Sequence, residues 1–236
     1  FSDGKIAVAF AGGRGVARYT LEPNSAYFLG HRPDRSIDLQ RIGLGETPLT
    51  QLGRHLPGRA GTTPVATIPV KILVDEEETA HRYLWEGKLR RRLEKASEIL
   101  HRHAMVRFEV VAVDTWRSDD QTTQFQVSLG EFETQVDPSP AQLAIGFTSQ
   151  YQVTKGRVHL GGTRGAMQSH ILLREWSNHV SETERLELLV HELGHYLGAA
   201  HSPEPTSVMR PVLGDRKARK TTFTIQFDPV NTLVMS

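Results

Sequence analysis

Apolar and polar positions along the chain follow two different patterns, and the change falls near residue 66. Before it, short alternating or β-rich runs are separated by turn-forming pairs such as Gly12-Gly13 and Pro23-Asn24. Runs of this length between turn signals are typical of antiparallel strands. We expect a small antiparallel β unit whose strands are residues 5–10, 15–21, 26–29 and 36–42.

A stretch rich in glycine and proline, residues 43–69, follows this unit and is the best candidate for a linker. The sequence therefore predicts two parts. Residues 1–60 form a small β-rich N-terminal segment or prosegment with its linker, and residues 66–236 form the larger domain.

The larger part contains several strand candidates. Residues 105–113 alternate strictly, with Val106, Phe108 and Val110 on one face and charged residues on the other, which is the period of a half-buried strand. A glycine-rich loop, residues 161–165, is expected between two later strands. The remaining strand candidates are the short apolar runs at residues 68–74, 143–147, 157–160 and 170–174.

Helix signals alternate with these strands. Asp75 followed by Glu78 resembles a capping box and predicts a helix that runs to about His103. Residues 125–136 carry apolar side chains at helical spacing beside a competing period of two. Asp228, followed by a proline, is expected to cap a final helix. With the capped helix described below, this order predicts an α+β fold in which helices pack on a mixed sheet.

Composition narrows the classes of protein. The chain has 236 residues, of which 38% are hydrophobic and 23% charged, as in an ordinary globular protein with its own core. A formal net charge of +1 gives no reason to expect a nucleic-acid partner. The absence of cysteine excludes disulfides, thiolate metal sites and a cysteine nucleophile. No apolar run approaches the roughly 20 residues that span a bilayer. Because no signal-peptide pattern precedes Phe1, we expect a processed or shortened form whose export signal is already gone.

A helix opened by a second capping box, Ser181 with Glu184, carries the chemical signal. The chain reads HELGHYLGAAH over residues 191–201. Because residues four apart share one face of a helix, His191 and His195 can direct two imidazoles at one metal ion. Two histidines at this spacing are often plain surface residues, so the other members of the pattern decide its meaning.

Glu192 directly follows the first histidine, where it can reach a water molecule at the metal as a general base without binding the metal itself. Catalytic zinc takes three protein ligands and keeps one open position. If Gly198 ends the helix in the left-handed conformation, His201 can approach the metal as the third ligand. Zinc held by three neutral imidazoles lowers the pKa of a water molecule towards about 7. Glu192 would then take the proton as the water attacks a peptide carbonyl.

These residues resemble the metzincin clan of zinc peptidases, whose pattern HExxHxxGxxH is matched without a gap. Met209, within the sequence SVMRP, stands eight residues after His201 and resembles the methionine of the Met-turn that lies beneath the metal in this clan. Ser202 makes the motif most similar to the matrixin branch. Because Pro211 stands where other branches carry a tyrosine, the resemblance implies no tyrosine ligand.

The resemblance implies a metzincin-like catalytic domain with a twisted, mixed five-stranded sheet, an active-site helix and a Met-turn. It further implies one catalytic zinc ion, a polypeptide substrate and a secreted endopeptidase. Substrates in this family lie along an antiparallel edge strand, for which residues 157–160 and the loop after them are our candidate. Residues 212–222 are expected to wall the S1′ pocket, and the basic run 216–220 within them to be a solvated loop.

This chain departs from the matrixin pattern in its regulation. Matrixins block their zinc with a propeptide cysteine, which is missing, so latency through residues 1–60 would need another ligand, for which Asp34 is the candidate. His159, His170 and His179 are present, but no carboxylate-rich loop accompanies them. The sequence therefore gives no support for a second zinc ion or for structural calcium.

Two other interpretations stay open at this stage. One is a zinc-containing binding module without activity, although a structural zinc site has no use for the carboxylate of Glu192. The other is a latent protease in which residues 1–60 act as the prosegment.

Overall fold

The structure, a computed structural model, describes two compact units of the chain, Phe1–Thr63 and Pro64–Ser236. No helix among the described residues is long and apolar enough to cross a membrane. The described residues are 6–12, 15–21, 26–31, 37–42, 65–119, 121–122, 124–149, 160–175 and 180–235.

The first unit contains the four expected strands, with slightly different bounds. They are β1 (Ile6–Gly12), β2 (Gly15–Leu21), β3 (Ala26–His31) and β4 (Ile37–Ile42). They pair as two separate antiparallel hairpins, β1 with β2 and β3 with β4. The candidate latency residue Asp34 lies outside the described residues.

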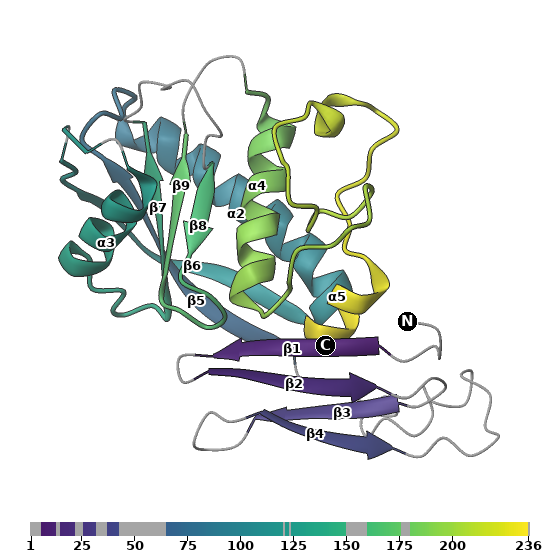
Figure 1. Ribbon diagram of the computed structural model, residues 1–236. Coiled ribbons are helices and arrows are strands. Elements are labelled where there is room, and N and C mark those ends of the chain that lie inside the picture. Colours follow the sequence, from purple (N-terminus) through teal and green to yellow (C-terminus); the bar gives the residue numbers. More distant parts are fainter. Residues whose placement is uncertain are drawn as a thin grey trace. The chain divides into compact units, whose positions relative to one another are not determined.

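The second unit is built on a five-stranded sheet with the order β6-β5-β7-β9-β8 (Figure 1). Strands β5, β6, β7 and β9 run parallel, and the edge strand β8 runs antiparallel to β9. The mixed sheet predicted from the sequence is therefore present. The strand bounds are β5 (Ala66–Asp75), β6 (Val106–Trp116), β7 (Leu143–Thr148), β8 (Gly161–Thr163) and β9 (His170–Arg174).

Helices cover both faces of this sheet. The helix predicted from spacing alone after residue 125 is present as α3. The final helix begins directly after Asp228, as expected. The helices are α2 (Arg82–Ala104), α3 (Phe125–Gln135), α4 (Glu182–Tyr196), the 3-10 turn η1 (Lys217–Arg219) and α5 (Pro229–Met235).

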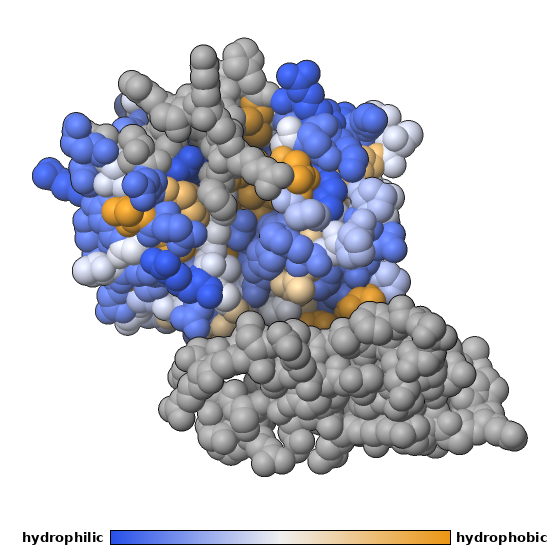
Figure 2. All heavy atoms as spheres, viewed as in Figure 1, coloured by the Kyte–Doolittle hydropathy of each residue, from blue (hydrophilic) through white to orange (hydrophobic). Residues whose placement is uncertain are grey.

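Successive side chains of the central strands point to opposite faces of the sheet and pack into two hydrophobic cores, one on each face. On β5, Ile72 and Val74 belong to the larger core, which the sheet shares with α2, α4 and α5, whereas Leu73 belongs to the smaller core beneath α3. The same alternation places Ile145 and Ala144 of β7 on opposite faces. This layering seats α4 beside the sheet edge at β8. Where Figure 2 colours the surface of this unit, it is mostly hydrophilic, with small apolar patches.

The start of the first long helix was predicted wrongly. Asp75 is the last residue of β5, and its carboxylate accepts a hydrogen bond from the Ser149 backbone N–H at 2.9 Å instead of capping a helix. Glu78 accepts from the nearby Ala80 N–H. Helix α2 begins at Arg82, after a residue that makes no side-chain cap. The spacing of Asp75 and Glu78 fits a capping box, but the Asp75 carboxylate binds Ser149, which lies 74 residues further along the chain.

Two further boundaries differ from expectation. Strand β5 begins at Ala66, so the predicted linker over residues 43–69 extends too far into the second unit. The edge strand β8 occupies residues that were predicted as a glycine-rich loop. Of the expected strand at residues 157–160, only Leu160 is described, and it is not in a strand. Short, glycine-rich edge strands carry almost no side-chain pattern, so only pairing with β9 reveals this one.

Candidate metal centre

Helix α4 begins where its local sequence predicts. The Ser181 Oγ accepts a hydrogen bond from the Glu184 backbone N–H at 3.3 Å, and the Glu184 carboxylate accepts from the Ser181 backbone N–H at 2.8 Å. These reciprocal bonds form the predicted capping box. The helix ends at Tyr196, and Gly198 follows with φ of +97°, a left-handed conformation that favours glycine.

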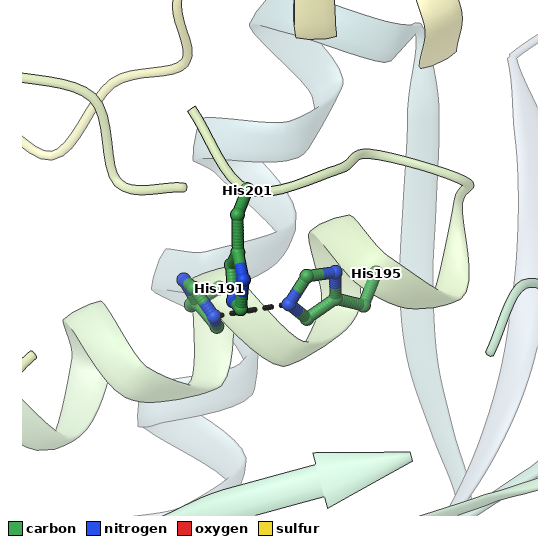
Figure 3. Close-up of side chains that lie close together, drawn as sticks. All are labelled: His191, His195 and His201. Carbon is green, nitrogen blue, oxygen red and sulfur yellow. Dashed lines mark hydrogen bonds between the residues drawn. The ribbon is translucent and has the colours of Figure 1, made fainter. Parts of the chain in front are cut away.

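The three histidines of the motif converge on one point (Figure 3). One nitrogen of each ring lies within 4.8 Å of the corresponding nitrogens of the other two. His191 and His195 share one face of α4, and the turn at Gly198 brings His201 back towards them. The structure therefore brings together the three residues proposed as ligands.

The outer nitrogens of the two helical histidines are bound to backbone carbonyls. The Nδ1 of His191 lies 2.8 Å from the Val208 carbonyl oxygen, and the Nδ1 of His195 lies 2.9 Å from the Ala199 carbonyl oxygen. Because a carbonyl only accepts, each Nδ1 must carry the proton. In a neutral ring the Nε2 is then unprotonated, which is the tautomer of a metal-binding histidine.

The two Nε2 atoms face each other at 3.1 Å. That distance suits a hydrogen bond only if one ring is a charged imidazolium. Burial, however, lowers the pKa of His191 to about 3 and also lowers the pKa of His195, so both rings are neutral at pH 7. Two lone pairs this close repel unless a cation lies between them. Zn–N bonds of about 2.0–2.1 Å at tetrahedral angles separate two ligand nitrogens by about 3.3 Å. The residues therefore fit a zinc ion.

Glu192 directly follows the first histidine of the cluster on α4 and is 5% exposed. Burial raises the pKa of its carboxyl group to about 8. A cation nearby would favour the ionised form and lower that pKa again. The carboxyl group makes no hydrogen bond to any residue in the described part of the chain, and it packs against the edge strand β8. A Cβ atom added to Gly161 would lie 3.1 Å from Glu192 Oε1.

Met209 is fully buried close to the histidine helix. A Cβ atom on Gly194 would lie 2.7 Å from Met209 Sδ, so the glycine between the two helical histidines allows this approach. The preceding residue, Val208, supplies the carbonyl that binds His191.

The segment after Met209 is tied to α4 by two ion pairs, of which the one between Arg210 and Glu187 is buried. Arg210 Nη2 lies 2.7 Å from Glu187 Oε1 and 3.0 Å from Asp215 Oδ1. Arg219 Nε lies 2.8 Å from Glu184 Oε2. The basic run 216–220 was expected to be a solvated loop, and its arginines and Lys220 are indeed exposed, although Arg219 also pairs with a carboxylate of the capping box.

Other histidines do not assemble a second site among the residues described. His170 is buried, with Nε2 at 2.8 Å from the Val136 carbonyl and Nδ1 at 3.0 Å from Ser169 Oγ. His159 and His179 lie outside the described residues. Within the described part, the cluster of His191, His195 and His201 is the one group of three metal-binding side chains.

A cavity of about 270 Å³ adjoins His195. Its walls come from the turn at Gly198, from Thr163 at the end of β8 and from Arg164 after it. A larger hollow of about 400 Å³ lies at the end of β5 beside Asp75, and no histidine lines it. Of these two hollows, the smaller one reaches the histidine cluster, through His195. Sequence reasoning missed the carbonyls of Val208 and Ala199, because a backbone acceptor leaves no mark in residue type.

Comparison with known proteins points the same way as this geometry. A peptidase family model described as Matrixin matches residues 73–233. No curated protein sequence matches the chain. Among solved structures, the crystal structure of archaemetzincin from Methanopyrus kandleri is similar over 71% of this chain and 93% of its own, with 16% sequence identity and a TM-score of 0.52. At this identity the likeness concerns the fold, and the predicted metzincin-like α+β fold is confirmed.

Proposed function

The chain belongs to the matrixin family of zinc metallopeptidases, and we propose that it is a zinc-dependent endopeptidase that hydrolyses peptide bonds within extended polypeptides. One observation carries this proposal. The unprotonated Nε2 atoms of His191 and His195 face each other at 3.1 Å, with His201 completing the cluster and the buried Glu192 next to His191 in the chain. Metal-assisted hydrolysis needs such a nitrogen-lined site with a proton acceptor at hand.

When bound, zinc supplies an activated water molecule and polarises the peptide carbonyl. The chain's own residues do the rest. Val208 and Ala199 orient His191 and His195 through their Nδ1 protons. Glu192 accepts the proton of the attacking water and passes it to the leaving amine. Its burial excludes bulk water from the carboxyl group and supports a role as a proton acceptor near neutral pH.

Two features support an extended polypeptide as substrate. Strand β8 is the antiparallel edge of the sheet and lies next to Glu192, where a substrate strand can pair with it. We assign the S1′ wall to residues 212–222, which Arg219 anchors on α4. We also assign Met209 to the Met-turn, because it is buried against Gly194 between the two helical histidines.

The proposal is tested with the full chain loaded with zinc and a library of peptides blocked at both ends. Blocked peptides can be cut only internally, so their cleavage identifies an endopeptidase. Glu192→Gln keeps the size of the side chain and removes the base; we expect kcat to fall at least about 100-fold while the bound zinc, measured by atomic absorption, stays at one per chain. Cleavage by Glu192→Gln at the rate of the unchanged chain would refute the mechanism.

A zinc-containing binding module is the competing function, and the same experiment separates the two. Zinc bound by the three histidines without any turnover across the library would favour the module. The buried carboxyl group of Glu192 argues for catalysis, because a structural zinc site has no need of it.

We extend the proposal to organisation and location. We assign catalysis to residues 66–236 and treat residues 1–60 as a separate prosegment or accessory unit; the division of the chain into Phe1–Thr63 and Pro64–Ser236 supports this. We further propose that the protein acts after secretion, on the strength of the family resemblance. Detection of zinc-dependent activity in culture medium, with none inside intact cells, would support secretion, and the reverse would refute it.

A further inference from the structure

The last described helix contacts the backbone that carries the metal cluster. The side chain of Asn231, on α5, is 5% exposed and forms two hydrogen bonds with Ala200. Its Oδ1 accepts from the Ala200 N–H at 2.9 Å, and its Nδ2 donates to the Ala200 carbonyl at 3.0 Å. Nδ2 also donates to Asp228 Oδ2 at 2.7 Å. These partners leave one arrangement of the amide, since two acceptors must face the NH₂ group.

The two bonds to Ala200 reach two different peptide groups. The Ala200 N–H shares its peptide group with the Ala199 carbonyl, which binds His195 Nδ1. The Ala200 carbonyl shares its peptide group with the nitrogen of His201. One side chain thus holds both the acceptor that orients the second histidine and the peptide group from which the third histidine begins.

Asp228 extends the same contacts to the first histidine. Its carboxylate accepts from Ser207 Oγ at 2.8 Å, and Ser207 Oγ in turn accepts from the Met209 N–H at 3.1 Å. The Met209 N–H belongs to the same peptide group as the Val208 carbonyl, which binds His191 Nδ1. Each histidine of the cluster is therefore bound to, or begins from, a peptide group that Asn231 holds directly or Asp228 holds through Ser207.

The charge of Asp228 suits this arrangement. Burial opposes its ionisation, but hydrogen bonds from Asn231 and Ser207 outweigh burial and lower the pKa to about 2. The carboxylate is then an acceptor only, which orients the Ser207 hydroxyl and the Asn231 amide. Hydrogen bonds in a chain polarise one another, so an anion at the far end makes the peptide carbonyls stronger acceptors and the imidazoles better ligands.

We propose that Asp228 and Asn231 form one positioning pair that aligns His191, His195 and His201 for zinc through the peptide groups on either side of Ala200 and between Val208 and Met209. The pair does not touch the metal or the substrate. The inference rests on the proposed zinc site but not on peptide cleavage. Partners behind metal ligands typically contribute about 10- to 100-fold to metal affinity.

The decisive variants are Asn231→Leu, which keeps the branched shape of the side chain and removes both bonds to Ala200, and Ser207→Ala, which breaks the route to His191 without altering α5. Thr232→Val is the matched control. Thr232 also lies on α5, but its Oγ1 contacts His103 Nδ1 on α2 at 3.1 Å, away from the cluster. The Thr232→Val substitution therefore loosens α5 but leaves the hydrogen bonds to Ala200 in place.

Zinc affinity of each full-length variant is measured by competition with a chromophoric chelator, and cobalt substitution gives the d–d spectrum of the site. We expect Asn231→Leu and Ser207→Ala each to weaken zinc binding about 10- to 100-fold and to change the cobalt bands. Thr232→Val should lower the melting temperature and leave both readouts unchanged. Affinity and spectrum unchanged in both Asn231→Leu and Ser207→Ala would overturn the inference.

The two proposals fail separately. Unchanged zinc affinity in variants of an active peptidase overturns the positioning pair alone. A chain that binds zinc, loses affinity in the variants and cleaves no peptide overturns the peptidase alone. If Asn231→Leu does not fold, Ser207→Ala on its own decides the question, because its hydroxyl is removed without adding volume.

Discussion

Gly194 and Met209 are in such close contact that the glycine has no room for a side chain. A Cβ at position 194 would lie 2.7 Å from Met209 Sδ and 2.7 Å from Phe227 Cε1. Since Gly194 directly precedes His195, the contact joins the ligand helix to the segment whose Val208 carbonyl orients His191. The spacing between the two segments, and with it the metal site, depends on this glycine.

Gly194→Ala should therefore destabilise the protein by about 1–3 kcal/mol, the usual cost of overpacking a core, and weaken zinc binding. Gly87→Ala is the control, because it also lies inside a helix but its Cβ would meet only the end of Arg91, at 3.4 Å. In the Gly87→Ala variant, the better helix propensity of alanine should raise the free energy of unfolding by up to about 1 kcal/mol. Urea unfolding of both variants measures the difference; equal stabilities would contradict the packing argument.

Gly161→Ala should slow catalysis more than it weakens zinc binding. The new Cβ would lie 3.1 Å from Glu192 Oε1 and 2.7 Å from Leu173 Cδ2, so the carboxyl group must move. We expect kcat to fall about tenfold or more, since general-base catalysis depends on position. Gly162→Ala is the matched control, because its new Cβ would lie 2.7 Å from Phe125 Cε1 and away from Glu192. Stopped-flow peptide cleavage at saturating zinc compares them, and equal kcat values in both would sink the assignment.

A buried charge cluster between α2 and the start of α4 should make stability depend on acid pH. Arg92 lies 2.7 Å from Glu175, and both side chains are buried. Burial opposes ionisation of Glu175, but hydrogen bonds from Arg92 and Lys88 outweigh it and lower its pKa to about 2. The pKa of Glu175 in the folded chain lies below its unfolded value of about 4.3. The stability that the ionised carboxylate contributes is therefore fully present above about pH 4.3 and is lost as the pH falls towards 2.

Glu175→Gln should accordingly cost about 3 kcal/mol at pH 7, and the difference from the unchanged chain should shrink below about pH 4.3. Glu133→Gln is the control, because Glu133 pairs with Arg164 at the surface, where a pair contributes at most about 1 kcal/mol. Guanidinium unfolding between pH 2 and 7 tests this. A pH-independent difference for Glu175→Gln would refute the electrostatic account.

A fragment of residues 64–236 should fold alone and bind zinc as the full chain does. Both hydrophobic cores and all three histidines lie within this unit. Circular dichroism and zinc titration check the folding, and a fragment that fails to bind zinc would contradict it. Peptide cleavage then distinguishes the role of residues 1–63: a large gain in the fragment identifies a prosegment, and equal activity identifies an accessory unit.

Several features were predictable because the residues that make them are neighbours in the chain. The capping box of Ser181 and Glu184 is closed by bonds across three residues, and the helical spacing of His191 and His195 follows from the same local geometry. The strand at β9 was predicted with its bounds, because an apolar run between turn signals needs no distant partner to be recognised. In each case short-range interactions decide the conformation.

Elsewhere the same kind of local signal gave a wrong answer. Asp75 and Glu78 have the spacing of a helix cap, yet Asp75 binds Ser149, which directly follows the neighbouring strand β7. The edge strand β8 has no side-chain pattern of its own and exists through its pairing with β9. A tertiary contact overrides a local preference of about 1 kcal/mol whenever it satisfies a buried polar group.

By itself, the sequence determined the three histidines that the structure brings together, Glu192 and the helix that carries two of these histidines, because side-chain type and helical period specify those positions. Only the tertiary structure decided how the site is held. Val208, Ala199 and Asn231 act on the histidines through backbone groups or across 31 residues of chain. Every residue carries the same backbone groups, so which of them meet a histidine depends on how the folded chain closes around α4.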